Sequence, residues 1–175
     1  FCPELMTSIF LRRPPQQKVG PLPDIGAPVP ERPGSDNSLI LFLRHVGCPF
    51  AEQAVREARI WKEHHPDVTV FVVSHGAAEA TMAWLKVIGG AGGLEVLTDP
   101  QRDLYGGWGL GYSRGWHFMG IASLVGVVSL WPKGIYNRQA SGTRWQRAGY
   151  FRVRSGRLVW RCIPDSAQQF SLPEN

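Results

Sequence analysis

The sequence contains little cysteine. Cys2, Cys48 and Cys162 are the three cysteines in 175 residues, and none belongs to a Cys-x-x-Cys pair or to a Cys/His cluster with zinc-ligand spacing. This number and scatter exclude a disulfide framework. We also expect no metal site and no cofactor. Because free thiols persist where disulfides are kept reduced, we expect a cytoplasmic protein.

Long apolar runs are also missing. The longest uncharged apolar stretch, residues 118–131, has 14 residues, whereas a helix that spans a bilayer needs roughly 20. Residues 1–20 lack the continuous apolar core of a signal peptide. We therefore expect no membrane span, and we interpret residues 118–131 as a core segment, a pocket wall or an interfacial patch.

Acidic residues are absent from residues 104–164. This stretch carries nine positive charges, so the remainder of the chain, whose net charge is +5, carries −4. The asymmetry indicates either pairing with the acidic helices or an anionic ligand or partner. No nucleic-acid-binding motif accompanies the basic stretch, and we expect no nucleic-acid partner.

The length and composition are typical of one globular domain. With 43% hydrophobic and 19% charged residues, the chain can bury a substantial core. Proline and glycine cluster between residues 7 and 38, which predicts an extended arm lying on the domain. We expect residues 1–17 to be an N-terminal arm or a non-native extension, residues 18–170 a single domain and residues 171–175 a C-terminal tail.

Hydrophobic patterning predicts alternating strands and helices in the first two thirds of the chain. Apolar runs rich in β-branched residues predict strands, and each is followed by a segment with helical spacing. Such alternation is typical of βαβ units with right-handed crossovers, and hence of a parallel sheet. The predicted strands are 38–43, 68–74 and 94–97; the predicted helices open at 48–49 and end near 64–66, span 77–88, start at 98–103, and span 165–170.

The last third predicts a β-hairpin. Residues 150–154 and 157–162 alternate in polarity around a tight turn at residues 155–156. We expect Arg152 to point outward from the first of these strands. Three residues of the second strand are expected to share one buried face: Leu158, Trp160 and Cys162.

Cys48 lies between the first predicted strand and the helix that follows it. Unpaired backbone N–H groups and the positive end of the helix dipole favour an anion at such a position, and the thiolate is the reactive form of cysteine. Pro49 suits the first helical turn, where its missing N–H costs nothing. Arg44 and His45 add positive potential just upstream. The pattern leaves both a reactive Cys48 and a buried, inert one open.

Four stretches carry a resemblance to a known family. They are Gly-Pro-Leu-Pro-Asp at 20–24, Leu-Phe-Leu-Arg-His-Val-Gly-Cys-Pro-Phe at 41–50, residues 97–105 with Gly109-Leu110, and Arg-Ala-Gly-Tyr-Phe-Arg-Val at 147–153. The chain resembles the peroxiredoxin-like branch of the thioredoxin superfamily, the relatives of alkyl hydroperoxide reductase and thiol-specific antioxidant. The resemblance implies an α/β, thioredoxin-like fold: a central mixed sheet of about five strands flanked by helices, with a Pro-rich N-terminal arm.

Two registers of this resemblance remain open. In the first, Cys48-Pro49 matches the Cys-Pro of peroxiredoxins, and Cys48 is the peroxidatic thiolate. In the second, Cys48-Pro-Phe-Ala51 matches the Cys-x-x-Cys of thioredoxins, and Ala51 stands where the second or the peroxidatic cysteine belongs. In either register Ala51 rules out a dithiol cycle between positions 48 and 51. Cys48 then works alone, with a partner in trans, or not as a redox thiol.

The resemblance also implies roles for basic residues. Peroxiredoxins use an arginine before a late strand to orient the peroxide and to hold the thiolate; Arg147 matches it best, and Arg144 is the near alternative. A guanidinium at Arg44 and a general base or hydrogen-bonding group at His45 complete the set. The expected catalytic residues are Cys48, Arg147, Arg44 and His45, and the expected substrate-binding residues are Pro49, Phe50, Arg144 and Trp145.

The resulting expectation is a one-cysteine peroxiredoxin-like enzyme. Cys48 would attack a peroxide or a disulfide, an external thiol reductant would regenerate it, and the resemblance implies a possible homodimer. One alternative is an isomerase or cyclase acting on an apolar metabolite in an aromatic pocket; another is a non-catalytic binding module. The aromatic residues considered for that pocket are Trp108, Trp116, Phe118, Trp131, Trp145 and Trp160.

Overall fold

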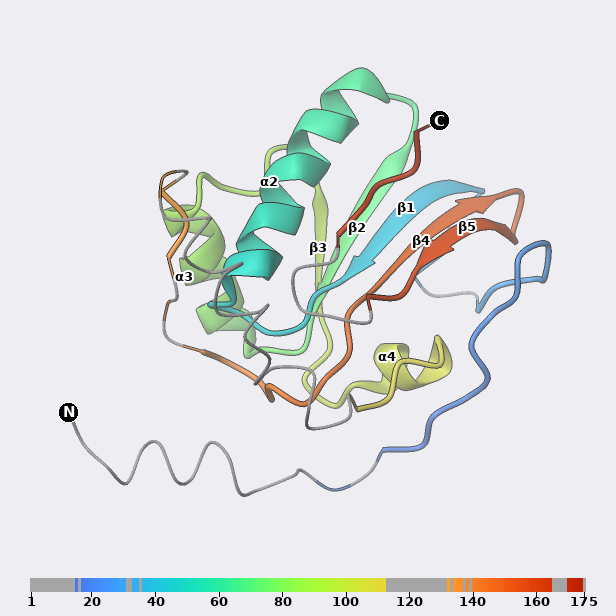
Figure 1. The fold of residues 1–175 in the computed structure, drawn as a ribbon, viewed down its shortest axis with the longest axis horizontal. Helices are drawn as coiled ribbons and strands as arrows, with labels where there is room; N and C mark the ends of the chain where they lie inside the picture. Colours follow the sequence, from blue (N-terminus) through green and yellow to red (C-terminus); the bar gives the residue numbers. More distant parts are fainter. Residues whose placement is uncertain are drawn as a thin grey trace.

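A five-stranded sheet lies at the centre of the computed structural model, with strand order β3-β2-β1-β4-β5 (Figure 1). The structure describes residues 15, 17–30, 33–34, 36–112, 132, 134–136, 138, 140–164 and 170–174. Its strands are β1 (Asn37–Phe42), β2 (Thr69–Ser74), β3 (Glu95–Thr98), β4 (Gly149–Arg154) and β5 (Arg157–Cys162), and its helices are α2 (Pro49–His64), α3 (Ala78–Val87) and α4 (Asp103–Gly107).

The sheet is mixed. Strands β1, β2 and β3 are parallel, whereas β4 is antiparallel to both β1 and β5. At its centre Leu41 pairs with Val72 of β2 and with Tyr150 of β4. The predicted α/β thioredoxin-like architecture is confirmed, and each predicted strand boundary lies within one residue of the observed one.

Both faces of the sheet are covered. Right-handed crossovers between parallel strands place α2 and α3 on the same face, and α4 covers the opposite face. Strands buried on both sides need apolar residues at successive positions, which explains the continuous run in β1. The first cluster includes Leu39, Leu41, Ala54, Val55, Trp84 and Leu85, and the second includes Ile40, Phe42, Tyr105, Trp108 and Phe151.

Asp99 fixes the start of α4. Its carboxylate accepts the backbone N–H groups of Asp103 at 3.0 Å, Leu104 at 2.9 Å and Tyr105 at 3.2 Å. These donors have no partner within the helix, and an anion there also complements the helix dipole. The helix start predicted at residues 98–103 is therefore present.

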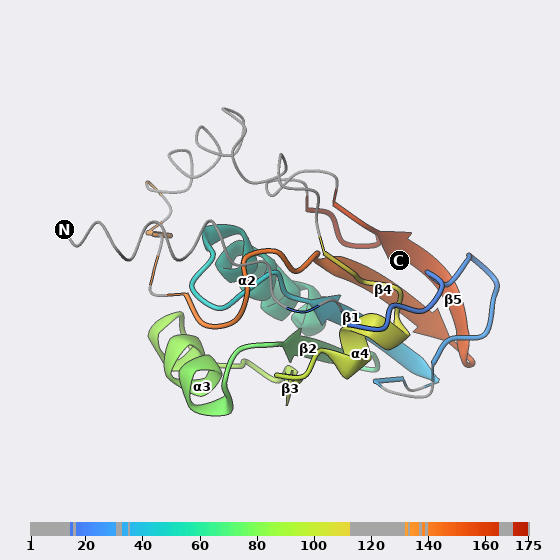
Figure 2. The ribbon, with the colours of Figure 1, turned by 90° about the horizontal axis from the view of Figure 1, so that it is seen from below.

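The N-terminal arm runs beside α4 and β5 (Figure 2). The Gly20 N–H donates to the Gly106 carbonyl at 2.9 Å, and the Gly26 N–H donates to the Leu158 carbonyl at 2.7 Å. A Cβ atom at Gly106 would lie 2.4 Å from the Lys18 carbonyl oxygen, so this close approach requires glycine. The arm thereby pairs part of the outer strand β5, which would otherwise present an open edge.

The prediction that Arg152 points outward to solvent is wrong. The residue is buried; its Nη1 donates to the Ser38 carbonyl at 3.1 Å, and its Nη2 donates to Asn37 Oδ1 at 2.6 Å. Strand β4 lies inside the sheet and is covered on both faces, so alternation along it does not separate buried from exposed side chains.

The predicted shared face of the last strand is also wrong. The pairing of β4 with β5 shifts at Arg152/Val153, which is a β-bulge or irregularity. Leu158 therefore packs in the cluster on the α4 face, whereas Trp160 and Cys162 pack against the cluster on the α2 face.

The C-terminal residues lie against α2. Trp61 Nε1 donates to the Pro173 carbonyl at 3.0 Å, and the rings of Phe170 and Tyr150 meet edge to face with centroids 5.0 Å apart. The apolar segment 118–131 and residues 165–169 of the predicted last helix lie outside the described residues.

Candidate functional site

Cys48 is the N-cap residue of α2. Its backbone is extended (φ −75°, ψ 129°), Pro49 occupies the start of the helix, and the Glu52 N–H donates to the Cys48 carbonyl at 3.0 Å. The cysteine is free and 4% exposed, within the cluster between the sheet and α2. The stretch 43–48, called the thiol turn below, thus ends on a covered sulfur at the positive end of a 16-residue helix.

Charged side chains converge on the thiol turn. The pKa of the Arg44 guanidinium is lowered, mainly by burial. Interaction with Cys48 raises it, and repulsion by Arg144 lowers it. The buried Tyr150 belongs to the same group, because burial and then the charge at Cys48 raise the pKa of its phenol. Cys48 therefore shares one electrostatic environment with two guanidinium groups and a neutral phenol.

His45 is a buried, neutral member of the thiol turn. Its Nδ1 lies 2.8 Å from the Val46 carbonyl oxygen, to which it donates. Burial is the main cause that lowers the pKa of His45 to about 3; that hydrogen bond opposes the shift, and the charges on Arg44 and Arg144 contribute to it. At neutral pH the imidazole therefore adds no positive charge beside Cys48.

The other predicted site residues fall into two groups. Pro49 and Phe50 are buried in the first turn of α2. Trp145 and Arg147 are half-buried before β4, where the Arg147 N–H donates to the Gly111 carbonyl at 3.1 Å. Within the described part of the chain, the structure shows Arg144 acting on the thiol turn, and it shows no interaction of the Arg147 side chain with Cys48.

Glu52 is a charged residue of this region that sequence analysis missed. It is fully buried one turn along α2 from Cys48, and its carboxylate accepts Arg56 Nη2 at 2.6 Å and Arg138 Nε at 3.3 Å. The signal was present, because Glu52 lies among the core-facing positions of the helix. An acidic residue at such a position indicates a buried partner.

His75 fastens the segment that covers the thiol turn. His75 Nε2 lies 3.0 Å from both the backbone nitrogen and the carbonyl oxygen of Thr143. His75 Nδ1 faces Tyr105 Oη at 3.4 Å, and Tyr105 Oη donates to the Leu43 carbonyl at 2.6 Å. Burial lowers the pKa of His75 to about 4. A Cβ atom at Gly142 would lie 2.6 Å from the imidazole, so glycine allows this contact.

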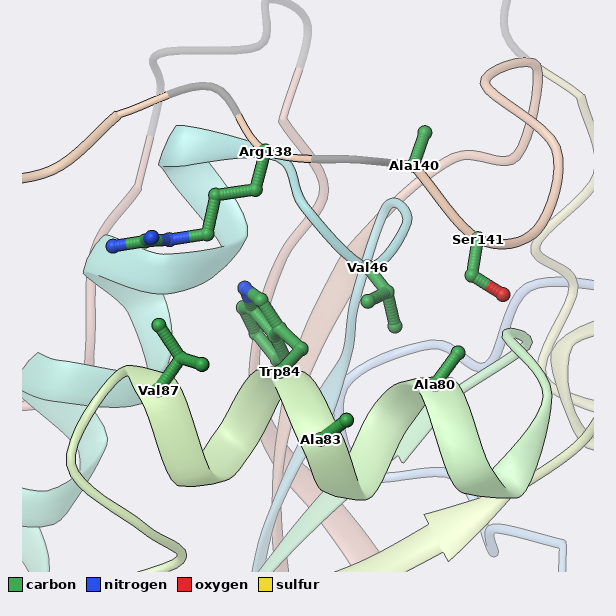
Figure 3. Close-up of a pocket in the computed structure, with 8 residues that line it drawn as sticks. All are labelled: Val46, Ala80, Ala83, Trp84, Val87, Arg138, Ala140 and Ser141. Carbon is green, nitrogen blue, oxygen red and sulfur yellow. The ribbon is translucent and has the colours of Figure 1, made fainter.

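A cavity of about 520 Å³ adjoins the thiol turn. Figure 3 shows α3 as one wall and the segment from Arg138 to Ser141 as the other. That segment is attached to the thiol turn, since the Arg138 N–H donates to the Gly47 carbonyl at 3.0 Å. We call this cavity the α3 groove; its lining residues are Val46, Ala80, Ala83, Trp84, Val87, Arg138, Ala140 and Ser141.

The α3 groove is not the aromatic pocket predicted from the second half of the sequence. None of the aromatic residues considered for that pocket is among the described residues that line the groove. Trp108 is fully buried in the cluster on the opposite face of the sheet, and Trp116, Phe118 and Trp131 lie outside the described residues. The aromatic side chain of the groove is Trp84, from α3.

Two kinds of feature are absent from the described residues. No helix there is long and apolar enough to cross a membrane. No group of three or more His, Cys, Asp or Glu side chains there could hold a metal ion.

Solved structures with a similar fold include a thiol peroxidase, a peroxiredoxin-like protein and a Prx3. A thiol peroxidase from Chromobacterium violaceum matches with a TM-score of 0.59 and 14% identity, over 89% of this chain and 84% of that chain. A peroxiredoxin-like protein from Aquifex aeolicus matches with a TM-score of 0.58 and 13% identity, over 86% and 82%. Reduced Prx3 from Vibrio vulnificus, in complex with hydrogen peroxide, matches with a TM-score of 0.54 and 12% identity, over 85% and 91%.

At sequence level, no family model and no curated protein matches the chain. The class defined by the structure is therefore a fold class, the thioredoxin-like fold. This is the fold that the resemblance in the sequence implied, and the solved structures named above have a similar fold.

Proposed function

We propose that this protein is a cytoplasmic thiol enzyme of the peroxiredoxin type, in which Cys48 reduces a peroxide or exchanges with a disulfide. The observation that carries the proposal is the place of Cys48 at the start of α2, beside Arg44 and Arg144. Free N–H groups of the first helical turn and two cations can stabilise negative charge that develops there during the reaction. The fold shared with thiol peroxidases supports the same chemistry.

The reaction begins with the Cys48 thiolate attacking the terminal oxygen of a hydroperoxide. The O–O bond breaks, the sulfur becomes a sulfenic acid, and the leaving alkoxide takes up a proton to become an alcohol. An external thiol then condenses with the sulfenic acid and releases water, giving a mixed disulfide. A second external thiol attacks that disulfide, which restores Cys48 and leaves the reductant as its own disulfide.

The neighbouring side chains have distinct roles in this proposal. Arg44 and Arg144 stabilise the thiolate and the negative charge that develops on the leaving oxygen. Tyr150 stays protonated and can donate a hydrogen bond in the same space, because its pKa is raised by burial. His45 positions the thiol turn through the Val46 carbonyl, since a neutral imidazole supplies no charge.

Removal of the thiol tests the proposal. We expect Cys48→Ser to abolish hydrogen peroxide consumption with dithiothreitol as reductant, and Cys162→Ser, the matched control at the other described cysteine, to retain it. Peroxide consumption by Cys48→Ser at the wild-type rate would overturn the proposal.

A second candidate function is the non-redox conversion or binding of an apolar metabolite. The α3 groove favours it, because Val46 of the thiol turn lines that groove. In this case a metabolite-dependent activity would survive Cys48→Ser, and peroxide would leave Cys48 unmodified.

A further inference from the structure

The wall of the α3 groove that α3 forms is open and apolar. Ala80, Ala83 and Val87 are spaced at helical intervals along one side of α3, and Val87 is 62% exposed. The two alanines leave the space that larger side chains would fill. The volume of about 520 Å³ falls within the range of about 300–1,000 Å³ that is typical of small-molecule sites.

One end of this groove holds an unpaired hydrogen-bond donor. Trp84 is 5% exposed, and its Nε1 is buried without a hydrogen-bond partner among the described residues. Figure 3 shows the indole ring standing on α3 with its nitrogen at the end turned toward Arg138. A buried donor left without an acceptor costs about 1–3 kcal/mol, so an acceptor placed here is favoured.

The same end of the groove is positively charged. Arg56 and Arg138 share the carboxylate of Glu52, while Arg59 Nη2 donates to the Ile88 carbonyl directly after α3 at 2.9 Å. Two guanidinium groups thus pair with one carboxylate, and the third, on Arg59, interacts with it electrostatically. Burial lowers the pKa of Arg59, and repulsion by Arg56 lowers it further, so an added anion would relieve an existing excess of positive charge.

We propose that the α3 groove binds a small apolar monocarboxylate. Its ring or branched chain lies along Ala80, Ala83 and Val87, and its carboxylate accepts the Trp84 indole N–H and pairs with Arg138. The Arg138 side chain is 32% exposed and can shift to admit the carboxylate while its Nε remains near Glu52. This site is separate from the chemistry at Cys48 and does not depend on it.

The test uses 2-naphthoate as the probe and proton–nitrogen NMR of the indole groups as the readout. The seven tryptophans give separate indole signals, and Trp84→Phe identifies the one from Trp84. We expect a saturable downfield shift of the Trp84 indole proton in the full-length protein, and the same shift in Cys48→Ser. A Trp84 signal that does not move at saturating 2-naphthoate overturns the proposal.

Variants and a neutral probe separate recognition of the carboxylate from unspecific binding. We expect Arg138→Gln to weaken binding by about tenfold or more. Lys86→Gln removes an exposed charge from α3 and should leave binding unchanged. Ala83→Leu, at an exposed position, should block the groove without disturbing the core. Equal affinity for 2-naphthalenemethanol, or equal losses in Arg138→Gln and Lys86→Gln, would contradict the proposal.

Discussion

The thiol turn and the α3 groove are neighbours of opposite character. Cys48 is 4% exposed and surrounded by side chains from α2, β4 and the segment before β4, whereas Val87 in the groove is 62% exposed. Two backbone contacts connect them, since Val46 and Gly47 both accept hydrogen bonds from the groove's outer wall. A single short loop therefore separates the buried Cys48 from the open α3 groove.

This contrast shows how the two regions are held in place. The region around the thiol turn is held by the neutral side chains of His45 and His75 and by the buried carboxylate of Glu52. An unpaired charge on these buried groups would destabilise the fold. The open side depends on small residues of α3, which tolerate substitution. Changes around Cys48 should therefore alter both stability and reactivity, while changes at the small residues of α3 should alter binding alone.

The largest expected effect is the loss of stability in acid. Burial holds the pKa of His75 at about 4 and that of His45 at about 3, while in the unfolded chain both titrate near about 6.5. The unfolded state therefore binds protons first as the pH falls, so stability is full above about pH 6.5 and declines toward the folded pKa values. His75 alone should account for about 3 kcal/mol at about pH 4, measured by urea unfolding.

A matched variant isolates this effect. His75→Gln can place its side-chain amide near the position of Nε2, where it still pairs with the Thr143 backbone, but it does not titrate. It should lose less stability than the wild type between neutral pH and about pH 4, even if it starts lower. An identical pH dependence in both proteins would show that His75 is not what acid disrupts.

The buried carboxylate gives the next effect. Glu52→Gln removes a charge that two partly exposed arginines share, so the free energy of unfolding should fall by about 1–2 kcal/mol, less than for a fully buried pair. Glu63→Gln, at an exposed position of the same helix, should cost little. Equal losses in urea unfolding would mean that Glu52 does not anchor the wall of the groove.

The smallest effect distinguishes two arginines. Arg144 acts electrostatically on Arg44 in the thiol turn, so Arg144→Gln should slow Cys48 oxidation by roughly fivefold, or about 1 kcal/mol of barrier. Arg147→Gln should change the rate less. Quenched-flow mass spectrometry with hydrogen peroxide measures both. A larger loss in Arg147→Gln would restore the role that the family resemblance gave to that residue.

Most of the fold could be predicted from the sequence, because local residue patterns dictate where its strands and helices begin and end. A short apolar run predicted β1 and a run rich in β-branched residues predicted β2, the carboxylate of Asp99 marked the start of α4, and Cys48-Pro49 marked the start of α2. It misjudged Arg152 because alternation cannot reveal that an interior strand is covered on both faces. It misjudged Leu158 because a shift in strand pairing leaves no trace in polarity.

The site was predictable only in part. Cys48 and Arg44 lie close in sequence, so a local motif was enough to bring them together. Arg144, His75 and Glu52 lie in the same region of the fold. Each interacts with a residue more than sixty positions away in the sequence, and no local pattern encodes such interactions. The α3 groove exists because Ala80 and Ala83 have small side chains. Alanine is typical of any helix, so the sequence did not indicate a groove.

The central claim is that Cys48 is the redox centre of this fold. The most direct measurement is intact-protein and peptide mass spectrometry after one equivalent of hydrogen peroxide, with dimedone present to trap sulfenic acid. The account predicts a dimedone adduct on Cys48, with Cys162 unmodified. An unmodified Cys48, with peroxide remaining in solution, would contradict it.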